Sequence, residues 1–374
     1  MADVSIRNVC KYYYSGGKLI NAVKNFNLDV ADGEIVAILG PSGCGKSSLM
    51  RMITGLEQIT RGDILIGGKK INDLDSSERN VSLAFESYAL YQHYTVRENI
   101  SFCLKLKKLP KNIINDKINW VSNLLNINDI LDKKPGGLSG GQQQLTSLAR
   151  VLVRNPSVTL LDEPISHLDS RTRFDLTMKL KEIHEKTNLT MIYVTHNQEE
   201  AMALSEKIVV MSMGELQQIG GRVEIMENSI NMFVAGFIGE PSINFISCKL
   251  EESEKNGTLQ AISKDSSFRI DVPVSFIDKI KKNNLREIIV GIRPIDLHYK
   301  KIKDDIEKIN GEVLYHEFLG EIGNIKIQLG ENTNLVAIIE PSYKIKKGQK
   351  IEMYYNPHSI NFFNPKTEYN LKKD

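Results

Sequence analysis

The sequence predicts a two-part fold in which an α/β domain is followed by a smaller all-β domain. The α/β class rests on residues 40–47, Gly-Pro-Ser-Gly-Cys-Gly-Lys-Ser, which fit the P-loop pattern G-x-x-x-x-G-K-[ST]. An apolar run at 34–39 precedes this loop and apolar residues at helical spacing follow it, as in a buried strand and a helix packed on a sheet. The all-β class rests on short strands of alternating polarity after residue 239, separated by turn residues.

Ahead of the P-loop, apolar residues alternate with polar ones and predict strands around 4–6 and 26–30. Between them lies an aromatic cluster at 12–14, before a Ser-Gly-Gly loop. One of these tyrosine rings could stack on a base, because a purine offers a π-face. Packing inside the protein is an equally good interpretation of the cluster.

The P-loop predicts a site for the phosphates of a nucleoside triphosphate. Glycines let successive backbone N–H groups converge on phosphate oxygens, and the dipole of the following helix favours negative charge there. Lys46 is expected to reach the β- and γ-phosphates, and the Ser47 hydroxyl to bind Mg²⁺. The residues expected to contact nucleotide here are Gly40, Pro41, Ser42, Gly43, Cys44, Gly45, Lys46, Ser47 and Ser48.

The amino-acid composition argues against several classes of protein. Charged residues make up 25% and apolar residues 41% of the 374 positions, which is ordinary for a globular protein. A formal charge of +2 gives no support to nucleic-acid binding. The four cysteines stand far apart, so neither a zinc site nor a disulfide framework is predicted. No signal peptide and no run of 18 apolar residues is present, so we expect a cytosolic chain whose membrane association comes through a partner.

A second glycine-rich stretch, Leu-Ser-Gly-Gly-Gln at 138–142, stands before another helical pattern. Ser139 is placed to cap that helix, and Gly140 and Gly141 expose backbone N–H groups at its start. A plain capped helix would not need two glycines. The stretch therefore predicts a second anion site.

Two further stretches place polar side chains at the ends of buried strands. The strand at 157–161 ends in Asp162 and Glu163, of which the first can hold Mg²⁺ through water and the second can orient or deprotonate an attacking water. The strand at 191–195 ends in His196, which is placed to contact a γ-phosphate. Acidic pairs on loops and structural histidines are common, and the strands before these residues favour the functional interpretation.

Taken together, the motifs resemble those of ABC-transporter ATPase subunits. Five stand in the family's order: Walker A at 40–47, the signature at 138–142, Walker B at 158–163, the D-loop at 166–169 and the switch histidine at 196. Several further stretches resemble the ATPase subunits of sugar importers, of the maltose and glycerol-phosphate type. The stretches similar to that subfamily lie at 88–91, 95–99, 233–239 and 291–294.

The resemblance implies an α/β P-loop ABC ATPase domain at 1–236, with a helical subdomain at about 87–155. An all-β OB-like regulatory domain is expected to follow at 237–374. An OB barrel can bind oligonucleotides, but an aromatic and basic face of that kind is not evident here. Contact between two copies, or docking of regulators, is the better expectation for this domain.

The resemblance also implies how ATP and Mg²⁺ are bound. Two nucleotide-binding domains, expected to be a homodimer, pair head to tail. Each ATP then lies between Lys46, Ser47 and Asp162 of one copy and Ser139, Gly140 and Gly141 of the other, with Gln142 and the D-loop residue Asp169 beside it. Glu163 acts on water, and His196 and Lys46 complete the catalytic set. Tyr13 best matches the family's adenine-stacking aromatic, with Tyr12 and Tyr14 as alternatives.

The implied partners are transmembrane permease subunits and, indirectly, an extracytoplasmic solute-binding protein. The permease is expected to dock in a groove beside the loop at 85–100. Closure and reopening of the ATPase pair would then drive the permease between inward- and outward-facing states. The chain is accordingly expected on the cytoplasmic face of the cell membrane, as a peripheral protein.

Three residues or stretches depart from the family's pattern. Glu86 stands where glutamine is expected, in the Q-loop that touches nucleotide and Mg²⁺ and signals to the permease. A glutamate there could strengthen metal binding, weaken the water network or alter coupling. Gln143 and Gln144 follow the signature where basic residues are usual, and His167 stands in the D-loop where asparagine is common.

The sequence favours an ATPase that energises a solute importer. The alternative is an ATP-binding regulatory module whose turnover is impaired by Glu86, although the intact Glu163 and His196 speak against it. A soluble ABC ATPase of translation or repair is a third possibility. Such proteins usually carry two cassettes or a long coiled coil, whereas this chain has one cassette and no heptad run.

Overall fold

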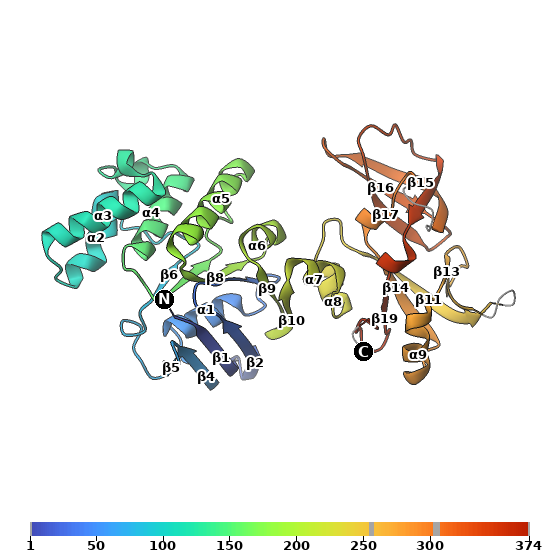
Figure 1. Cartoon of the computed structure of the whole chain (residues 1–374), viewed down its shortest axis with the longest axis horizontal. Coiled ribbons are helices and arrows are strands. Elements are labelled where there is room, and N and C mark those ends of the chain that lie inside the picture. The colour runs from blue at the N-terminus through green and yellow to red at the C-terminus, as the bar shows by residue number, and fades with distance from the viewer. Residues whose placement is uncertain (1, 254–257, 302–306, 373–374) are drawn as a thin grey trace. The chain divides into compact units, whose positions relative to one another are not determined.

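The computed structural model describes residues 2–253, 258–301 and 307–372. Contacts within the chain divide it into two compact units, Met1–Arg222 and Val223–Asp374 (Figure 1). The division falls before the predicted boundary at 236/237. The buried Arg293 guanidinium donates to the carbonyls of Met226 and Ile238, and so ties the segment after residue 222 to unit 2.

The central sheet of unit 1 has the strand order β10-β9-β3-β8-β7-β6, with all but β10 parallel. Its strands are β3 (Ile35–Leu39), β6 (Val81–Ala84), β7 (Val158–Asp162), β8 (Thr190–Thr195), β9 (Lys207–Ser212) and β10 (Glu215–Gly221). The middle strands β3 and β8 are buried along their whole length. A strand covered on both faces needs a continuous apolar run, which is the pattern that predicted β3.

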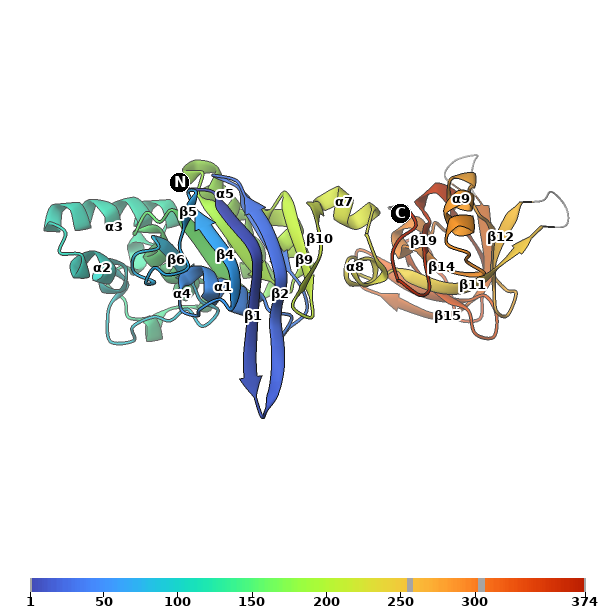
Figure 2. The ribbon, with the colours of Figure 1, turned by 90° about the horizontal axis from the view of Figure 1, so that it is seen from below.

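The helix after the P-loop, α1 (Lys46–Thr54), lies between this sheet and a second, antiparallel one. That second sheet consists of β2 (Lys18–Val30), β1 (Val4–Ser15), β4 (Arg61–Ile66) and β5 (Lys69–Lys70). Leu49, Met52 and Ile53 of α1 pack with the apolar side chains of both sheets. The β1–β2 hairpin extends well beyond the rest of its sheet (Figure 2).

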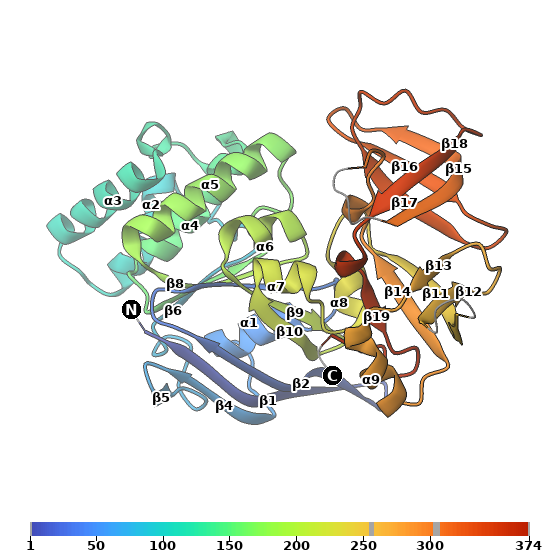
Figure 3. The ribbon, with the colours of Figure 1, turned by 45° about the vertical axis from the view of Figure 1, so that its right-hand side comes forward.

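The other face of the central sheet is covered by helices, visible together in Figure 3. They are α2 (Val96–Leu106), α3 (Lys111–Leu125), α4 (Gly140–Leu152), α5 (Ser170–Thr187) and α6 (Gln198–Leu204). In α3 the residues Ile114, Ile118 and Val121 are buried, as the helical spacing predicts, whereas Ile113 is exposed. The helices α2 to α4 lie within the predicted helical subdomain.

A buried asparagine fixes the loop that precedes α2. The Asn99 side chain accepts from the Tyr91 N–H and donates to the carbonyls of Tyr91, Tyr94 and Thr95. Thr95 and Glu98 form a capping box at the start of the same helix. These bonds satisfy backbone groups that the irregular loop would otherwise leave unpaired.

Unit 2 contains two antiparallel sheets that share one apolar core. The first sheet is β13 (Arg269–Asp271), β12 (Leu259–Ser263), β11 (Asn244–Glu252), β14 (Glu287–Ile292) and β19 (Asn361–Phe363). The second is β17 (Asn334–Ile339), β16 (Gly323–Gln328), β15 (Glu307–Phe318) and β18 (Lys350–Tyr355). The short helices are α7 (Arg222–Glu227), α8 (Met232–Phe237) and α9 (Val274–Lys282). The prediction of a second, β-rich part is confirmed.

The side chain of Asp265 joins the two sheets of unit 2. Its carboxylate accepts hydrogen bonds from Ser263 and Ser267 in the β12–β13 turn. It also accepts from the Thr333 hydroxyl and the Asn332 N–H in the β16–β17 turn. These donors hold the pKa of Asp265 well below its usual range, and the Ser267 and Ser263 hydroxyls have the largest effects.

We expect Asp265→Ala to lower the free energy of unfolding of unit 2 by about 2 kcal/mol at neutral pH, as typical for hydrogen bonds to a charged group. Folding lowers the pKa of Asp265. Its contribution to the free energy of unfolding is therefore complete above the unfolded-state pKa of about 3.9, and it is lost as the pH falls toward the folded-state pKa. Urea unfolding at pH 7 and pH 3 measures it. The exposed Asp278→Ala is the control, expected within about 0.5 kcal/mol. The prediction would be contradicted if Asp265→Ala lowered the free energy of unfolding by the same amount at pH 7 and at pH 3.

Candidate nucleotide site

The predicted site residues of unit 1 gather at one edge of the central sheet. The strands β3, β8, β7 and β6 are neighbours and parallel, so their carboxyl ends meet there. The P-loop follows β3, His196 follows β8, Glu163 follows β7 and Glu86 follows β6. In open α/β sheets this edge is where ligands bind.

The P-loop takes its shape from glycines that nothing else could replace. Gly45 has φ +111°, and a Cβ there would stand 2.3 Å from the Ala22 carbonyl oxygen. A Cβ on Gly40 would stand 2.4 Å from the Met211 carbonyl oxygen. Gly45 directly precedes α1 at its N-cap position, and among the described residues no side chain caps this end. The first N–H groups of α1 are therefore available to an anion.

Lys46 is held inside the loop. Its side chain is buried, and Nζ donates to the carbonyls of Gly40 (2.8 Å) and Pro41 (3.1 Å). The same Nζ lies 3.9 Å from a carboxylate oxygen of Glu163. The neighbouring thiol of Cys44 is buried, which raises its pKa and makes it a poor nucleophile.

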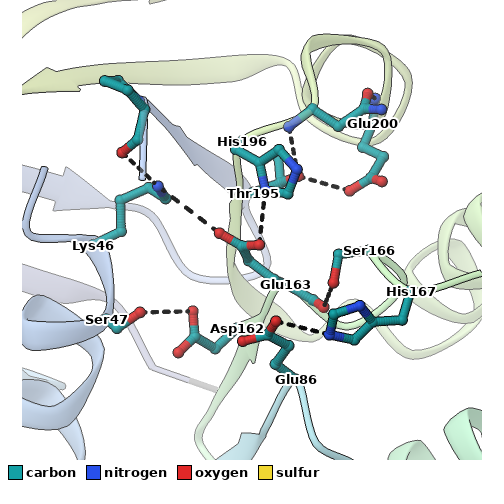
Figure 4. Close-up of polar contacts among 12 residues, drawn as sticks. Lys46, Ser47, Glu86, Asp162, Glu163, Ser166, His167, Thr195, His196 and Glu200 are labelled. Atoms are coloured by element: carbon teal, nitrogen blue, oxygen red, sulfur yellow. Dashed lines mark hydrogen bonds and ion pairs between the residues drawn. The ribbon is translucent and has the colours of Figure 1, made fainter. Parts of the chain in front are cut away.

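Two of the three expected metal ligands, Ser47 and Asp162, lie next to each other, with Ser47 Oγ 3.4 Å from Asp162 Oδ1 (Figure 4). Both are hard oxygen donors of the kind Mg²⁺ prefers. Burial raises the pKa of Asp162, and so do the nearby carboxylates Glu163 and Glu86. Within the described parts of the chain, no three His, Cys, Asp or Glu residues form a group that could hold a metal unaided. The donor set therefore fits Mg²⁺ that shares phosphate oxygens, as is usual for this ion.

Glu163 and His196 contact each other directly. Glu163 Oε2 lies 2.7 Å from His196 Nδ1, and Glu163 has a left-handed backbone with φ +46°. Such a conformation is uncommon outside glycine. A carboxylate partly buried between an imidazole and a lysine is arranged to receive or orient a proton of water.

A buried carboxylate behind His196 was missed by sequence reasoning. Glu200 is 3% exposed and accepts from the Tyr193 hydroxyl (2.8 Å) and the Thr195 hydroxyl (2.7 Å). Thr195 Oγ1 in turn accepts from the N–H of Asn197. These bonds fix the backbone on both sides of His196. In the sequence Glu200 is one more polar residue at the start of a helix. Its burial could not be predicted, because it depends on contacts with Tyr193 and Thr195 of the preceding strand.

The signature lies at the start of α4, where Ser139 and Gln142 form a capping box. A Cβ on Gly140 would stand 3.0 Å from Leu168 Cδ2, and one on Gly141 would stand 2.9 Å from Thr172 Cγ2. The two glycines thus allow the helix start to lie against the D-loop and α5. No hydrogen bond among the described residues links Ser139, Gly140 or Gly141 to the P-loop of the same chain.

Tyr13 approaches the P-loop helix through its hydroxyl. The hydroxyl lies 3.2 Å from Ser48 Oγ and donates to Glu57, while the Lys11 amine lies 4.9 Å from the ring centre. Side chains alternate along a strand, so Tyr12 and Tyr14 belong to the opposite face of β1. Of the three tyrosines, Tyr13 is therefore the one beside the P-loop helix.

The Q-loop and the D-loop contact each other through two residues that depart from the family's pattern. Glu86 Oε1 lies 2.9 Å from His167 Nε2, and both side chains are about half exposed (Figure 4). Asp169, two residues further on, caps α5 by accepting from the N–H of Thr172. The Asp169 carboxylate is thus engaged in the chain's own helix.

A groove lies beside the Q-loop. A cavity of about 250 Å³ is lined by Phe85, Tyr88 and Tyr91 of the loop after β6, and by Phe102, Arg150 and Arg154. Arg150 donates to the Ala89 carbonyl and lies over the Tyr91 ring, 4.7 Å from its centre. The wall of the groove therefore includes the loop that carries Glu86.

Comparison with known proteins gives the family. The family described as "ABC transporter" matches residues 23–166. The maltose/maltodextrin import ATP-binding protein MalK of Aliivibrio fischeri is 39% identical over 97% of this chain and 96% of its own length. The oligosaccharides import ATP-binding protein MsmX of Bacillus subtilis is 36% identical over 100% of both chains. The chain belongs to the ATP-binding subunits of ABC transporters, in the sugar-importer subfamily.

A solved structure extends this to the fold of unit 1. The ATP-binding cassette MJ0796, in a dimeric post-hydrolysis state bound to ADP and Pi, is 33% identical with a TM-score of 0.54. The match covers 58% of this chain and 98% of that cassette. The importer subunit is thus an ATP-binding protein and an ATPase coupled to solute transport. Among the described residues, no helix is long and apolar enough to cross a membrane.

Proposed function

We propose that this chain powers the import of sugars or related carbohydrates by hydrolysing ATP in a head-to-tail pair. The observation that carries the sugar assignment is the length of the match: MalK of Aliivibrio fischeri, a maltose/maltodextrin import protein, aligns with 97% of this chain, including unit 2. A general ATPase cassette such as MJ0796 aligns with 58%.

The residues at the sheet edge have complementary roles in this proposal. Lys46 and the N–H groups of the P-loop bind the β- and γ-phosphates, and Ser47 and Asp162 hold Mg²⁺. Mg²⁺, when bound, neutralises charge on the transferred phosphoryl group. Glu163 takes a proton from the attacking water or orients it, and His196 fixes that carboxylate and contacts the γ-phosphate. The Tyr13 hydroxyl lies beside Ser48 of α1, so a base stacked on the Tyr13 ring would lie next to the P-loop helix.

The signature of a second copy completes the site. The capping box of Ser139 engages the N–H of Gln142, and the N–H groups of Gly140 and Gly141 in the same first turn suit the γ-phosphate of a nucleotide bound to the other copy. The dimeric state of the MJ0796 cassette supports such a pair. A single copy then holds its nucleotide without the second set of donors and turns over poorly.

The groove beside the Q-loop is the proposed docking site of the permease. It is lined by aromatic rings, of which Phe85 and Tyr91 are exposed, and by two arginines, residue types that are common at protein interfaces. Docking there would place this subunit on the cytoplasmic face of the membrane as a peripheral protein. An extracytoplasmic solute-binding protein would deliver solute to that permease.

Uptake of labelled solutes tests the proposal in the source organism. We expect deletion of the gene to reduce uptake of one or more carbohydrates, such as maltose or glycerol phosphate, at least tenfold. The unaltered gene should restore uptake and Glu163→Gln should not. Glutamine uptake serves as the control and should stay unchanged. Normal carbohydrate uptake with loss of amino-acid uptake would contradict the sugar assignment.

A further inference from the structure

We propose that Glu86 and His167 act as one unit that holds the Q-loop to the D-loop, with His167 as a positioning residue for the site. The inference rests on the proposed function, because it concerns how that ATPase is controlled. It gives a shared role to Glu86 and His167, two residues that depart from the family's pattern. Neither loop alone would reveal it.

The pair has the geometry of a specific contact. His167 Nε2 lies 2.9 Å from Glu86 Oε1, and the two residues come from loops after different strands, β6 and β7. An asparagine at 167 would have a shorter side chain than this imidazole. The longer imidazole reaches a carboxylate on the neighbouring loop, and a carboxylate is the stronger acceptor.

The contact also occupies Glu86, one of the two carboxylates that the sequence predicts as Mg²⁺ ligands. Three carboxylates lie in this region, and each faces a different partner: Asp162 faces Ser47, Glu163 faces His196, and Glu86 faces His167. Glu86 still lies close enough to Asp162 to affect it electrostatically. In this arrangement Glu86 is a link between loops rather than a metal ligand.

The D-loop connects this link to Glu163. Ser166, adjacent to His167, donates through its hydroxyl to the Glu163 carbonyl oxygen at 3.1 Å. The Ser166 N–H lies 3.4 Å from the same oxygen, so two bonds fix the left-handed backbone of Glu163. A displacement of His167 would therefore move the peptide that carries the Glu163 side chain.

The Q-loop connects the link to the groove. Phe85 and Tyr88, on either side of Glu86, line the groove, and Tyr88 and Ala89 have positive φ values of 58° and 48°. Backbone of this kind is retained when surrounding contacts hold it, and it has other conformations close in energy. Occupation of the groove would change the position of Glu86, and the contact with His167 would pass that change to Glu163.

A double-mutant cycle tests the unit. The variants are Glu86→Gln, His167→Asn and the double variant, with Lys186→Gln, which removes a surface pair with Glu182 on α5, as matched control. We measure kcat and KM for ATP, the Mg²⁺ concentration giving half-maximal turnover, and the Kd of a fluorescent ATP analogue with and without Mg²⁺. Coupling must be shown this way, because proximity does not establish it.

We expect each single substitution to lower kcat about three- to fivefold with KM and Kd within twofold, and the double variant to lose no more than either single one. The Mg²⁺ requirement should stay within twofold in Glu86→Gln. Multiplicative losses, or a silent His167→Asn with a tenfold higher Mg²⁺ requirement in Glu86→Gln, would overturn the inference. Failure of the unaltered chain to bind the ATP analogue would instead overturn the proposed function.

Discussion

Substitution of Glu163 by glutamine is expected to lower ATP turnover at least ~100-fold, the lower limit for loss of a general base. Glutamine has nearly the same shape and can still accept a hydrogen bond from His196, but it cannot take up a proton. The Glu163 carboxylate lies 2.7 Å from His196 Nδ1 and 3.9 Å from Lys46 Nζ, so both partners remain in place.

Nucleotide binding should survive this change, because the phosphate contacts proposed for the P-loop do not involve Glu163. The Kd of a fluorescent ATP analogue in Glu163→Gln should therefore stay within about threefold of the unaltered value. Glu182→Gln is the control, since Glu182 is likewise paired with two basic side chains, Lys179 and Lys186, but lies on the surface of α5. Equal losses of binding and turnover would show that Glu163 supports the fold of the site and does not act in the reaction.

Substitution of Ser139 by aspartate is expected to lower turnover about fifty-fold or more while leaving nucleotide affinity within about twofold. Aspartate caps a helix as well as serine does, so the start of α4 should keep its structure. It also adds a negative charge at the N–H groups proposed to face a γ-phosphate, and repulsion in a closed pair is strong. The nucleotide at the chain's own P-loop lies away from this charge.

The neutral Ser139→Asn provides the comparison, because asparagine keeps the cap without the charge. Its turnover should remain within about fivefold of the unaltered chain. If Ser139→Asp loses binding together with turnover, the signature acts on the chain's own nucleotide. If both properties are unchanged, the signature has no role at a phosphate.

The sequence predicted those parts of the site that depend on local pattern. The P-loop, the Asp162–Glu163 pair and His196 each follow a buried strand, and the parallel order of β3, β8 and β7 brings them to one edge. The double glycine of the signature was interpreted as an anion site alone. The structure adds a packing reason, since a Cβ at Gly140 or Gly141 would come within about 3 Å of the Leu168 or Thr172 side chain and would require that side chain to shift.

Contacts between distant segments could not be predicted. The sequence shows Glu86 and His167 as two separate departures from the family's pattern. Their contact follows from the pairing of β6 with β7, which no local sequence pattern predicts. The burial of Glu200 likewise depends on Tyr193 and Thr195 of β8. The boundary near residue 222 depends on Arg293, whose partners lie more than fifty residues earlier in the chain.

Release of phosphate from ATP by the purified, unaltered chain, measured with Mg²⁺ and again with the metal removed by EDTA, tests the central claim most directly. We predict turnover that requires Mg²⁺ and falls to background in EDTA. A chain that binds the ATP analogue but releases no phosphate in either condition would contradict the account. Turnover that appeared with Glu86→Gln alone would favour an ATP-binding regulatory module in place of a transport ATPase.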